Sequence, residues 1–461
     1  MHVVVVGGGI AGLAAAHDLV DRPGVAVTVL DAAPHVGGKL RTAPFAGVPV
    51  DLAADAFLAR RPEAVQLCRE LGIDGELVPP ATGAASLWVG GRLRPLPEGT
   101  LLGVPTDLRA LARSGVLSPL GLARAAVEPL LPGRPLGPDD APVADVVRRR
   151  FGREVTERLV DPLVGGINAG DTRQLSIDAV APGIGAAARR GRSLLRGARA
   201  TRDAATAATE APVFLGFPTG MGRLVEALVD RLEAAGATVR TNARVEAVDR
   251  KAGGGYRVAT DRGPLDADAV VVAVPAPAAA RLVTPLAPGV GEALAAVEHA
   301  SVAIVALAWP AAAVPGPLVG SGFLVPRAER RLLTACSWAS SKWAHLGGTG
   351  SVLLRASAGR AGDGRAEAMD DEDLVERLSV ELRAAIGVDG PPSEARVTRW
   401  PAGFPQYRPG HLPRMAAARA ALADAAPGVA VAGAALGAVG IPACIGTGRA
   451  AAEQVTTGLG G

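Results

Sequence analysis

The hydrophobic pattern of the chain is clearest at its beginning. Residues 3–6 are four consecutive valines, and a glycine-rich turn at residues 7–12 separates them from an alanine- and leucine-rich segment that reaches Val20. A short β-branched run predicts a buried strand, and the segment after the turn has the spacing of a helix packed on it. A second apolar run, residues 25–30, follows. The chain therefore begins with a predicted strand, turn, helix and strand of a parallel sheet.

Later apolar runs are expected to return to this sheet. Residues 269–274 and 429–432 are all-apolar runs, which are typical of strands buried on both faces. Between them, residues 301–307 and 352–356 predict strands of a separate sheet, and residues 371–386 predict a strong helix. The sheet that begins the chain is therefore discontinuous in sequence.

Three further segments carry specific expectations. Residues 107–195 show helical periodicity and predict an inserted helical domain, within which the glycine-rich stretch 161–171 is expected to be a loop between helices. The arginine-rich run 188–202 is expected to be a solvated connection in preference to a docking patch. A helix is expected over residues 447–457, after a glycine and proline turn.

Composition narrows the class of protein. The chain has 461 residues, a net charge of +3 and three cysteines without metal-ligand spacing, so no nucleic acid, metal or disulfide framework is indicated. No signal peptide precedes the first strand, which favours a cytoplasmic protein. Residues 300–326 carry no charge, but their prolines favour two strands joined by a loop over a transmembrane helix. Peripheral membrane contact stays open.

The first turn has the glycine spacing of a dinucleotide-binding fingerprint. Its first glycine makes the turn, its second lets the backbone approach a pyrophosphate, and its third packs helix on strand. The helix that follows directs its free N–H groups at the phosphates. An acid at the end of the second strand suits an unphosphorylated ribose, as in FAD or NAD. The expected contacts are Gly7, Gly9, Ile10, Ala11, Gly12, Asp31 and Ala32.

A second glycine pair decides between these cofactors. The run Gly37-Gly38-Lys39-Leu40-Arg41-Thr42 resembles the second glycine motif of the FAD-dependent amine-oxidase and porphyrinogen-oxidase superfamily, which NAD dehydrogenases lack. Near the end of the chain, a glycine turn opening a helix places N–H groups for flavin O2 or N1. We therefore expect FAD. The further expected contacts are Gly38, Lys39, Arg41, Thr42, Val245, Gly433, Val439, Gly440 and Ile441.

These elements predict an α/β fold with an FAD-binding Rossmann-like domain, a mixed-sheet substrate domain and an inserted helical domain. The expected ranges are 1–80, 212–281 and 411–461 for the FAD-binding domain, 81–94 and 282–410 for the substrate domain, and 95–211 for the helical insert.

From Met1 to about Gln454 the chain resembles the bacterial FAD-dependent porphyrinogen oxidases. The resemblance rests on the second glycine motif and on segments 57–64, 161–171, 322–326, 340–343, 399–401, 405–412 and 439–442. It implies oxidation of coproporphyrinogen III to coproporphyrin III in haem biosynthesis, with hydride leaving a meso carbon for flavin N5 and O2 reduced to peroxide. Transient contact with neighbouring haem-pathway enzymes stays open.

The resemblance also suggests site residues. Asp55 is the nearest candidate for proton handling, Arg41 and Arg61 are matched as partners of the substrate propionates, and Asn168 completes the expected catalytic set. Ala434 and Ala443 stand where the family more often has polar residues beside the flavin, which implies weaker FAD retention or altered flavin electronics. The alternatives are a protoporphyrinogen IX oxidase, a flavin amine oxidase and a non-catalytic carrier with an FAD fold.

Overall fold

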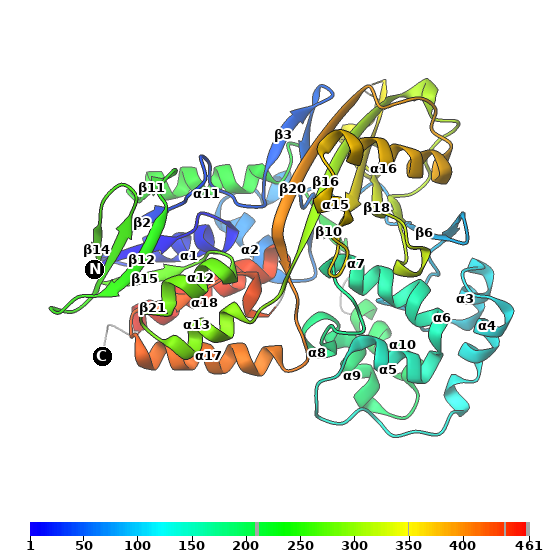
Figure 1. Ribbon diagram of the computed structural model, residues 1–461, viewed down its shortest axis with the longest axis horizontal. Helices are drawn as coiled ribbons and strands as arrows, with labels where there is room; N and C mark the ends of the chain where they lie inside the picture. Colours follow the sequence, from blue (N-terminus) through cyan, green and yellow to red (C-terminus); the bar gives the residue numbers. More distant parts are fainter. Residues whose placement is uncertain (208–211, 349, 438, 458–461) are drawn as a thin grey trace.

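The computed structural model describes residues 1–207, 212–348, 350–437 and 439–457. A parallel sheet with its helices, a larger mixed sheet and a group of helices lie at the left, upper right and lower right of Figure 1. This arrangement confirms the expected fold class. The residue ranges assigned to the three domains stay a prediction.

The parallel sheet has five strands, with both faces covered. Val3 and Val5 of β1 pack against α1, α2, α11 and α18, whereas Val4 and Val6 pack on the opposite side against α12, α13, α17 and a small antiparallel sheet. Successive side chains of a strand point to opposite faces, so a strand covered on both sides must be apolar throughout. In spatial order, the strands are β11 (Thr238–Arg240), β2 (Ala26–Leu30), β1 (His2–Val6), β15 (Ala269–Val272) and β21 (Val429–Val431).

The elements around this sheet come from all parts of the chain. The helices are α1 (Ile10–Val20), α2 (Pro62–Glu70), α11 (Gly222–Ala234), α12 (Ala276–Val283), α13 (Pro288–Ala295), α17 (His411–Ala425) and α18 (Ile441–Thr457). The short strands are β3 (Thr42–Phe45), β4 (Val48–Asp51), β5 (Phe57–Leu58), β10 (Phe214–Leu215), β12 (Val245–Arg250), β13 (Tyr256–Thr260) and β14 (Leu265–Ala267). The last helix begins at Ile441, six residues before the expected start, because Pro442 fits the first turn of a helix.

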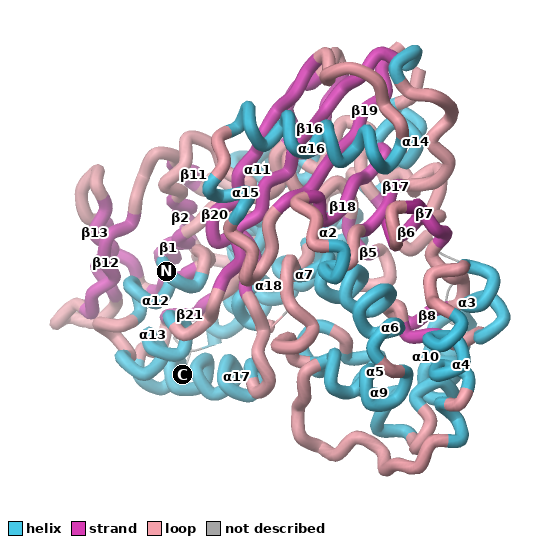
Figure 2. Tube along the Cα trace, turned by 45° about the vertical axis from the view of Figure 1, so that its right-hand side comes forward, coloured by secondary structure: helices cyan, strands magenta, loops and turns pink. Residues whose placement is uncertain are grey.

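The mixed sheet has seven strands, and Figure 2 shows α16 (Asp371–Ile386) lying across it. The Asp370 carboxylate accepts the N–H of Asp373 at the start of α16, and Gly387 ends the helix with φ +70°, which explains why its limits match the sequence pattern. In spatial order, the strands are β20 (Glu394–Pro405), β16 (His299–Pro310), β19 (Ser351–Ala358), β18 (Leu333–Trp338), β17 (Gly322–Leu324), β6 (Ser86–Val89) and β7 (Arg92–Pro95).

The helical part joins the mixed sheet along one side. Its elements are α3 (Leu108–Ser114), α4 (Pro119–Ala126), α5 (Val143–Phe151), α6 (Arg153–Val155), a π-helix (Thr156–Gly165), α7 (Gly166–Asn168), α8 (Ile177–Val180), α9 (Pro182–Arg190), α10 (Leu194–Ala207) and the hairpin β8 (Thr100–Leu101) and β9 (Val104–Pro105). Short helix α14 (Ala339–Lys342) lies at the end of β18, and α15 (Arg365–Ala368) precedes α16.

Two expectations for this part are wrong. Residues 161–168 are helical, because burial of Leu159, Val160 and Val164 outweighs the local preference of glycine and proline for a loop. Residues 188–202 mostly form α9 and α10 and not a solvated connection, because Leu194 and Ala198 are buried on their inner face. Within the described residues, no helix is long and apolar enough to cross a membrane.

The helical part contains a buried charged pair that suits a stability test. The Glu128 carboxylate is fully enclosed and accepts hydrogen bonds from Arg150 Nε at 2.7 Å, Ser193 Oγ at 2.7 Å and the Leu194 N–H at 2.8 Å. It therefore neutralises Arg150 and caps the start of α10 at once.

We expect Glu128→Ala to lower the free energy of unfolding by about 3–5 kcal/mol, because Arg150 would keep a buried charge without a partner. Denaturant unfolding measures the change. Glu157→Ala, which removes the exposed partner of Arg153, is the control and should cause a far smaller loss. Equal effects of the two substitutions would contradict the assigned role of Glu128.

Candidate active site

The glycines of the first turn have three different surroundings. A Cβ on Gly7 (φ +105°) would lie 2.7 Å from the Ala273 carbonyl oxygen, and one on Gly12 would lie 1.9 Å from the Gly7 carbonyl oxygen. A Cβ on Gly9 would meet no protein atom within 4 Å. Gly7 and Gly12 are therefore needed for packing, whereas Gly9 borders open space at the N-terminus of α1, which has no side-chain cap.

Asp31 lies beside this turn at the end of β2. Its carboxylate accepts the N–H groups of Gly8 and Ala33, each at 2.7 Å, and each oxygen keeps a lone pair for a ribose hydroxyl. The Asp31 carbonyl also accepts the N–H of Ala243, two residues before Val245. This bond places the half-buried Val245 near the adenosine end of the expected site.

The second glycine pair packs against the first turn. The Gly37 N–H donates to the Gly8 carbonyl at 2.7 Å, and a Cβ on Gly38 would lie 3.3 Å from the Gly9 Cα. Lys39 Nζ donates to the Gly403 carbonyl of β20 at 2.5 Å. The side chain of the half-buried Arg41 has no hydrogen-bond or ion-pair partner among the described residues, so its guanidinium is available to a ligand.

The hydroxyl of Thr42 has a structural use. It donates to Asp51 Oδ1 at 2.6 Å and accepts the Gly222 N–H at 2.9 Å, which ties the second glycine motif to the start of α11. Its direct contact with a cofactor stays a prediction.

The C-terminal turn completes the same edge of the sheet. Gly433 and Gly440 have positive φ and open space where a Cβ would stand, and Val439 and Ile441 lie at the start of α18. A Cβ on Gly448 would lie 2.1 Å from the Ala11 carbonyl, so α18 passes directly over α1 and their N-termini lie at one edge.

Two side chains that hold this turn were not expected from the sequence. Thr447 Oγ1 accepts the Gly433 N–H at 2.9 Å, and the buried Tyr407 hydroxyl donates to the Ala434 carbonyl at 2.6 Å. Neither residue type has a sequence signal that distinguishes a turn support from an ordinary core residue. The turn is therefore fixed before a ligand binds.

These positions fit FAD. Glycine positions without neighbouring atoms and the N-termini of α1 and α18 lie at the same edge, at the carboxyl ends of parallel strands, where dinucleotides bind in such folds.

Asp55 lies in a buried ion-pair network. Its carboxylate contacts Lys342 Nζ at 2.8 and 2.9 Å, Trp343 Nε1 at 3.1 Å and Arg355 Nη1 at 2.9 Å. Burial by itself raises the pKa of Asp55, but the charges of Arg355 and Lys342 outweigh it and hold the pKa well below its usual range. Asp55 is therefore ionised, fully hydrogen-bonded and a poor proton acceptor.

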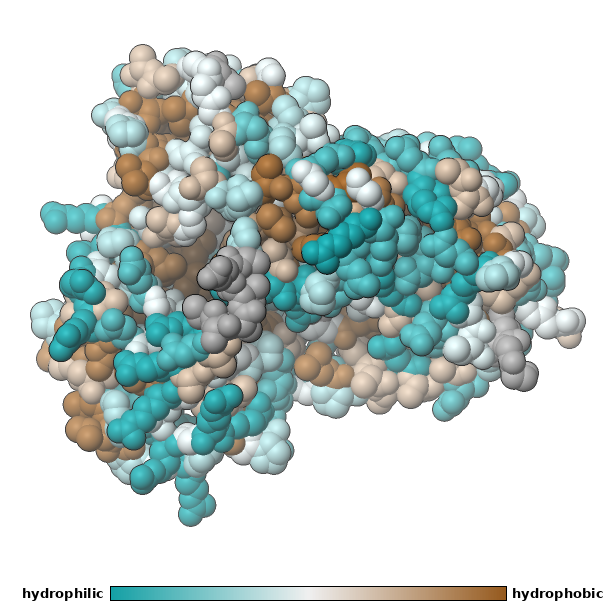
Figure 3. Space-filling view, turned by 180° about the vertical axis from the view of Figure 1, so that it is seen from behind, coloured by the Kyte–Doolittle hydropathy of each residue, from teal (hydrophilic) through white to brown (hydrophobic). Residues whose placement is uncertain are grey.

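A cavity of about 80 Å³, open to solvent, lies between the helical part and the mixed sheet. Its wall is mainly apolar, with Val302, Ile304 and Phe404 on the sheet side and two charged side chains, Asp161 and Arg360. Phe404 directly follows Gly403, the residue that contacts Lys39, so the cavity lies next to the cofactor motifs. Figure 3 shows the surface hollowed between the lobes of the molecule.

The three expected catalytic residues do not come together at one point. Asn168 is buried near the cavity, where its Nδ2 donates to the Val164 carbonyl at 2.8 Å and its carbonyl accepts Gln406 Nε2 at 3.0 Å. Arg61 is exposed at the start of α2, and its side chain has no partner among the described residues. Asp55 belongs to the network described above. Asp161 and Arg360, which line the cavity, were not among the expected catalytic residues.

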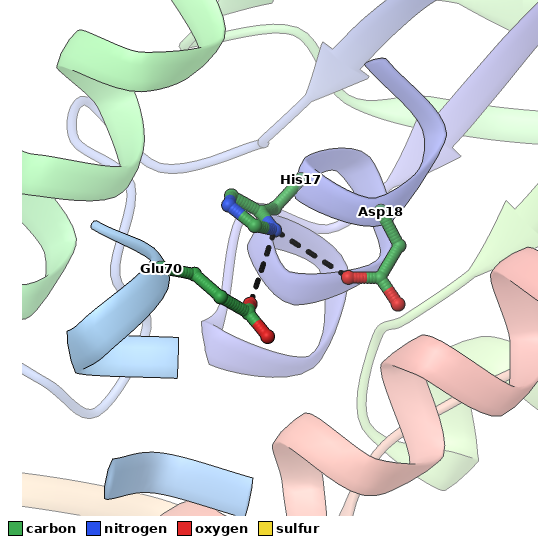
Figure 4. Close-up of side chains that lie close together, drawn as sticks. All are labelled: His17, Asp18 and Glu70. Carbon is green, nitrogen blue, oxygen red and sulfur yellow. Dashed lines mark hydrogen bonds and ion pairs between the residues drawn. The ribbon is translucent and has the colours of Figure 1, made fainter. Parts of the chain in front are cut away.

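One group of potential metal ligands has a simpler explanation. Figure 4 shows His17 and Asp18 of α1 beside Glu70 of α2. The Arg449 guanidinium contacts Glu70 at 2.5 Å and Asp18 at 3.8 Å, so it already supplies a positive charge next to both carboxylates. We interpret the group as part of an ion-pair cluster that joins α1, α2 and α18.

We call the glycine turns at residues 7–12, 37–38, 433–437 and 439–441, together with Asp31, the cofactor cradle. The fold and this cradle define the class of FAD-dependent oxidoreductases. Comparison with known proteins identifies the group within this class: the chain belongs to the flavin containing amine oxidoreductase family, which it matches over residues 10–456.

Individual relatives are similar over nearly their full lengths. The chain is 36% identical to coproporphyrinogen III oxidase of Bacillus subtilis, with 99% of this chain and 98% of that protein covered. It is 38% identical to coproporphyrinogen III oxidase of Mycobacterium tuberculosis, with 99% and 97% covered. A crystal structure from Exiguobacterium sp. 255-15, provisionally assigned as a protoporphyrinogen oxidase, superposes with a TM-score of 0.88 at 30% identity, covering 99% of this chain and 98% of that one.

The surroundings of Gly9 generate a direct test of the cofactor site. We expect Gly9→Val to abolish FAD binding while the protein stays folded, because the new side chain would fill only the space kept for the ligand. Asp31→Ala should weaken binding by about 1–3 kcal/mol. Flavin released on acid precipitation and circular dichroism check both points. Normal flavin content in Gly9→Val would place the cofactor elsewhere.

Asp51 generates a pH test. Burial raises the pKa of Asp51 from 3.8 to about 6, against the hydrogen bond from Thr42 and the charge of Arg355. Between pH 4 and 6 the unfolded chain releases this proton while the folded protein keeps it, so the raised pKa costs stability as pH rises, up to about 3 kcal/mol above pH 6.

Asp51→Asn keeps an acceptor for Thr42 and the Met221 N–H but does not ionise. We expect its stability relative to the natural protein to increase from pH 4 to 6 and then to level off. Denaturant unfolding at each pH measures the difference. A difference that is constant across this range would show that Asp51 has an ordinary pKa.

Proposed function

We propose that the protein is an FAD-dependent coproporphyrinogen III oxidase of haem biosynthesis, with O2 as acceptor and H2O2 as product. The glycine turns and Asp31 would hold FAD, which would supply a hydride acceptor that O2 can reoxidise. Each step removes one hydride and one proton from the macrocycle and converts one O2 to one H2O2. The relatives named coproporphyrinogen III oxidase support the choice of substrate.

The observation that carries this proposal is the cavity beside the cofactor cradle. A largely apolar macrocycle needs an apolar wall, and Val302, Ile304 and Phe404 supply one. The reacting carbon must also approach the flavin, and the peptide link from Gly403 to Phe404 joins the cavity wall to the Lys39 contact.

The residue roles follow from this placement. We assign Asp55 a positioning role, because its oxygens are occupied by Lys342, Trp343 and Arg355. Asp161 is the better candidate for accepting a pyrrole N–H, since it lines the cavity and burial raises its pKa. Asn168 would orient the wall at this point through its bonds to Val164 and Gln406.

Two arginines near the cofactor motifs are candidates for binding anionic groups. The side chains of Arg41 and Arg61 have no protein partner among the described residues, so each is a candidate for a propionate carboxylate or a cofactor phosphate. The cofactor contacts expected from the glycine motifs are part of the same proposal. We further propose that the enzyme is cytoplasmic and that its contacts with membranes or with neighbouring haem-pathway enzymes are transient.

The alternative of a flavin amine oxidase has less support. Those enzymes usually frame the flavin with aromatic residues and a lysine, whereas Lys342 is held by both oxygens of Asp55. A lysine fixed in this way has little freedom to hold a water against the flavin. Protoporphyrinogen IX is the closer alternative, because it is also a porphyrinogen. It differs in carrying two propionates where coproporphyrinogen III carries four.

We expect a higher kcat/KM for coproporphyrinogen III than for protoporphyrinogen IX in detergent-free buffer, measured as porphyrin fluorescence in air. Arg41→Ala and Arg61→Ala should raise KM for the first substrate, because each exposed arginine partner contributes about 0.2–1 kcal/mol. Gly9→Val, which should lack FAD, is the inactive control. Equal efficiency with both substrates, or oxidation of an amine alone, would reject the proposed substrate.

A further inference from the structure

Arg360 is the only cationic side chain among the residues that line the cavity. It lies in the turn between β19 and α15, and its side chain is only 9% exposed. A buried cation normally has a carboxylate partner or a complete set of hydrogen bonds, because burial strongly disfavours an unpaired charge.

Arg360 has neither. Its Nη2 donates weakly to the Arg331 carbonyl at 3.3 Å, and its Nε has no hydrogen-bond partner. The nearest carboxylate, Asp363, lies 4.0 Å from Nε, too far for a hydrogen bond. Asp363 is instead engaged by Arg365 at 2.7 and 2.8 Å.

Two neighbouring arginines, which are themselves positively charged, have contacts of their own. Arg327 donates to the carbonyls of Ala361 and Gly170, and Arg331 lies 3.7 Å above the Trp88 ring. Burial, followed by the charge of Arg327, lowers the pKa of Arg360, and the charges of Asp161 and Asp363 oppose this shift only in part. Asp161 is the acid that faces the same cavity, and its Oδ1 is already bonded to Thr172 at 2.9 Å. The cavity wall therefore has an unsatisfied N–H on a buried guanidinium, with Asp161 as the one carboxylate in the same wall.

The turn that carries Arg360 is held in place. A Cβ on Gly359 (φ +91°) would lie 2.7 Å from the Ser301 carbonyl, and the Ala361 N–H donates to the Ala169 carbonyl at 2.7 Å. The first contact fixes the turn to the sheet, and the second fixes it to the helical part. The guanidinium is thus positioned before a ligand arrives, which lowers the entropy lost on binding.

We propose that Arg360 binds a peripheral carboxylate of the substrate inside the cavity. For the proposed reaction this group is one of the propionates, and the inference rests on that function for the identity of the ligand. A guanidinium with a free Nε suits the two oxygens of a carboxylate, and the contact would fix the rotation of the macrocycle against the flavin. Arg360 thereby becomes a specificity residue that favours the more carboxylated porphyrinogen.

The test is equilibrium binding of porphyrins to the FAD-loaded protein, followed by porphyrin fluorescence. The ligands are coproporphyrin III, its tetramethyl ester and protoporphyrin IX. The variants are Arg360→Met, which keeps the length of the side chain, and Arg360→Lys, which keeps its charge. Arg377→Met, at an exposed position on α16, is the matched control for loss of one positive charge.

We expect Arg360→Met to weaken coproporphyrin III binding by about tenfold to a hundredfold, as for a buried charged hydrogen bond, and to leave the ester unchanged. Arg360→Lys should recover part of the loss, and Arg377→Met should have no effect. In turnover, Arg360→Met should raise KM more than it lowers kcat. FAD content and thermal stability of the variants show that the fold is intact.

Two results would overturn the inference separately. Equal weakening of the acid and the ester would show that Arg360 supports only the shape of the cavity. Coproporphyrin III binding that is unchanged in Arg360→Met would place the carboxylates elsewhere while the proposed function stands. Failure of the natural protein to bind any of the three porphyrins would instead reject the proposed function, and with it the propionate.

Discussion

The buried carboxylate of Asp55 is the interaction on which the placement of the two sheets depends. It lies in the loop after β4, next to the cofactor motifs, and its partners Lys342 and Arg355 belong to the mixed sheet and its short helix α14. Two further hydrogen bonds join the same loop to the mixed sheet. Trp400 Nε1 donates to the Leu52 carbonyl at 3.1 Å, and Arg355 donates to the Ala53 carbonyl. Within the packed structure, loss of any one of these three charged groups would leave buried charges without their full set of partners, which is strongly unfavourable.

This constraint explains how a cofactor cradle and a substrate cavity can come from distant parts of one chain. β20 passes the Lys39 ammonium and the cavity at Gly403 and Phe404, near its end in the mixed sheet, and the chain continues to Tyr407, which supports the C-terminal turn. One segment of the chain therefore contacts the second glycine motif, the cavity and the last turn in succession. Because its backbone is fixed at each contact, the distance between flavin and macrocycle is set by the fold itself.

The strand, turn and helix that carry the expected cofactor contacts could be predicted from the sequence because their requirements are local. Gly7, Gly9 and Gly12 follow from backbone geometry at one turn, and the limits of α16 follow from Asp370 and Gly387 at its ends. The segment 161–171 was mistaken for a loop, because the burial of Leu159 and Val164 that keeps it helical depends on residues far away in the chain.

The partners of Asp55 and the state of Arg360 could not be predicted. Asp55 and Lys342 are 287 positions apart, and in an arginine-rich chain no local pattern selects Arg355 as a partner. Arg360 stands out only because nearby acids are engaged by other groups, as Asp363 is by Arg365. Such facts are properties of the packed structure, and a sequence pattern shows residue types but not which charges remain unpaired.

The central claim is that the cavity holds a porphyrinogen against the flavin. Rapid mixing of the FAD-loaded protein with coproporphyrinogen III in the absence of O2 tests it most directly, because the flavin then has no acceptor for its electrons. The account predicts loss of the oxidised-flavin absorbance at a rate that rises with substrate concentration and saturates, followed by recovery when O2 is admitted. Flavin that stays oxidised after mixing, in protein shown to contain FAD, would contradict it.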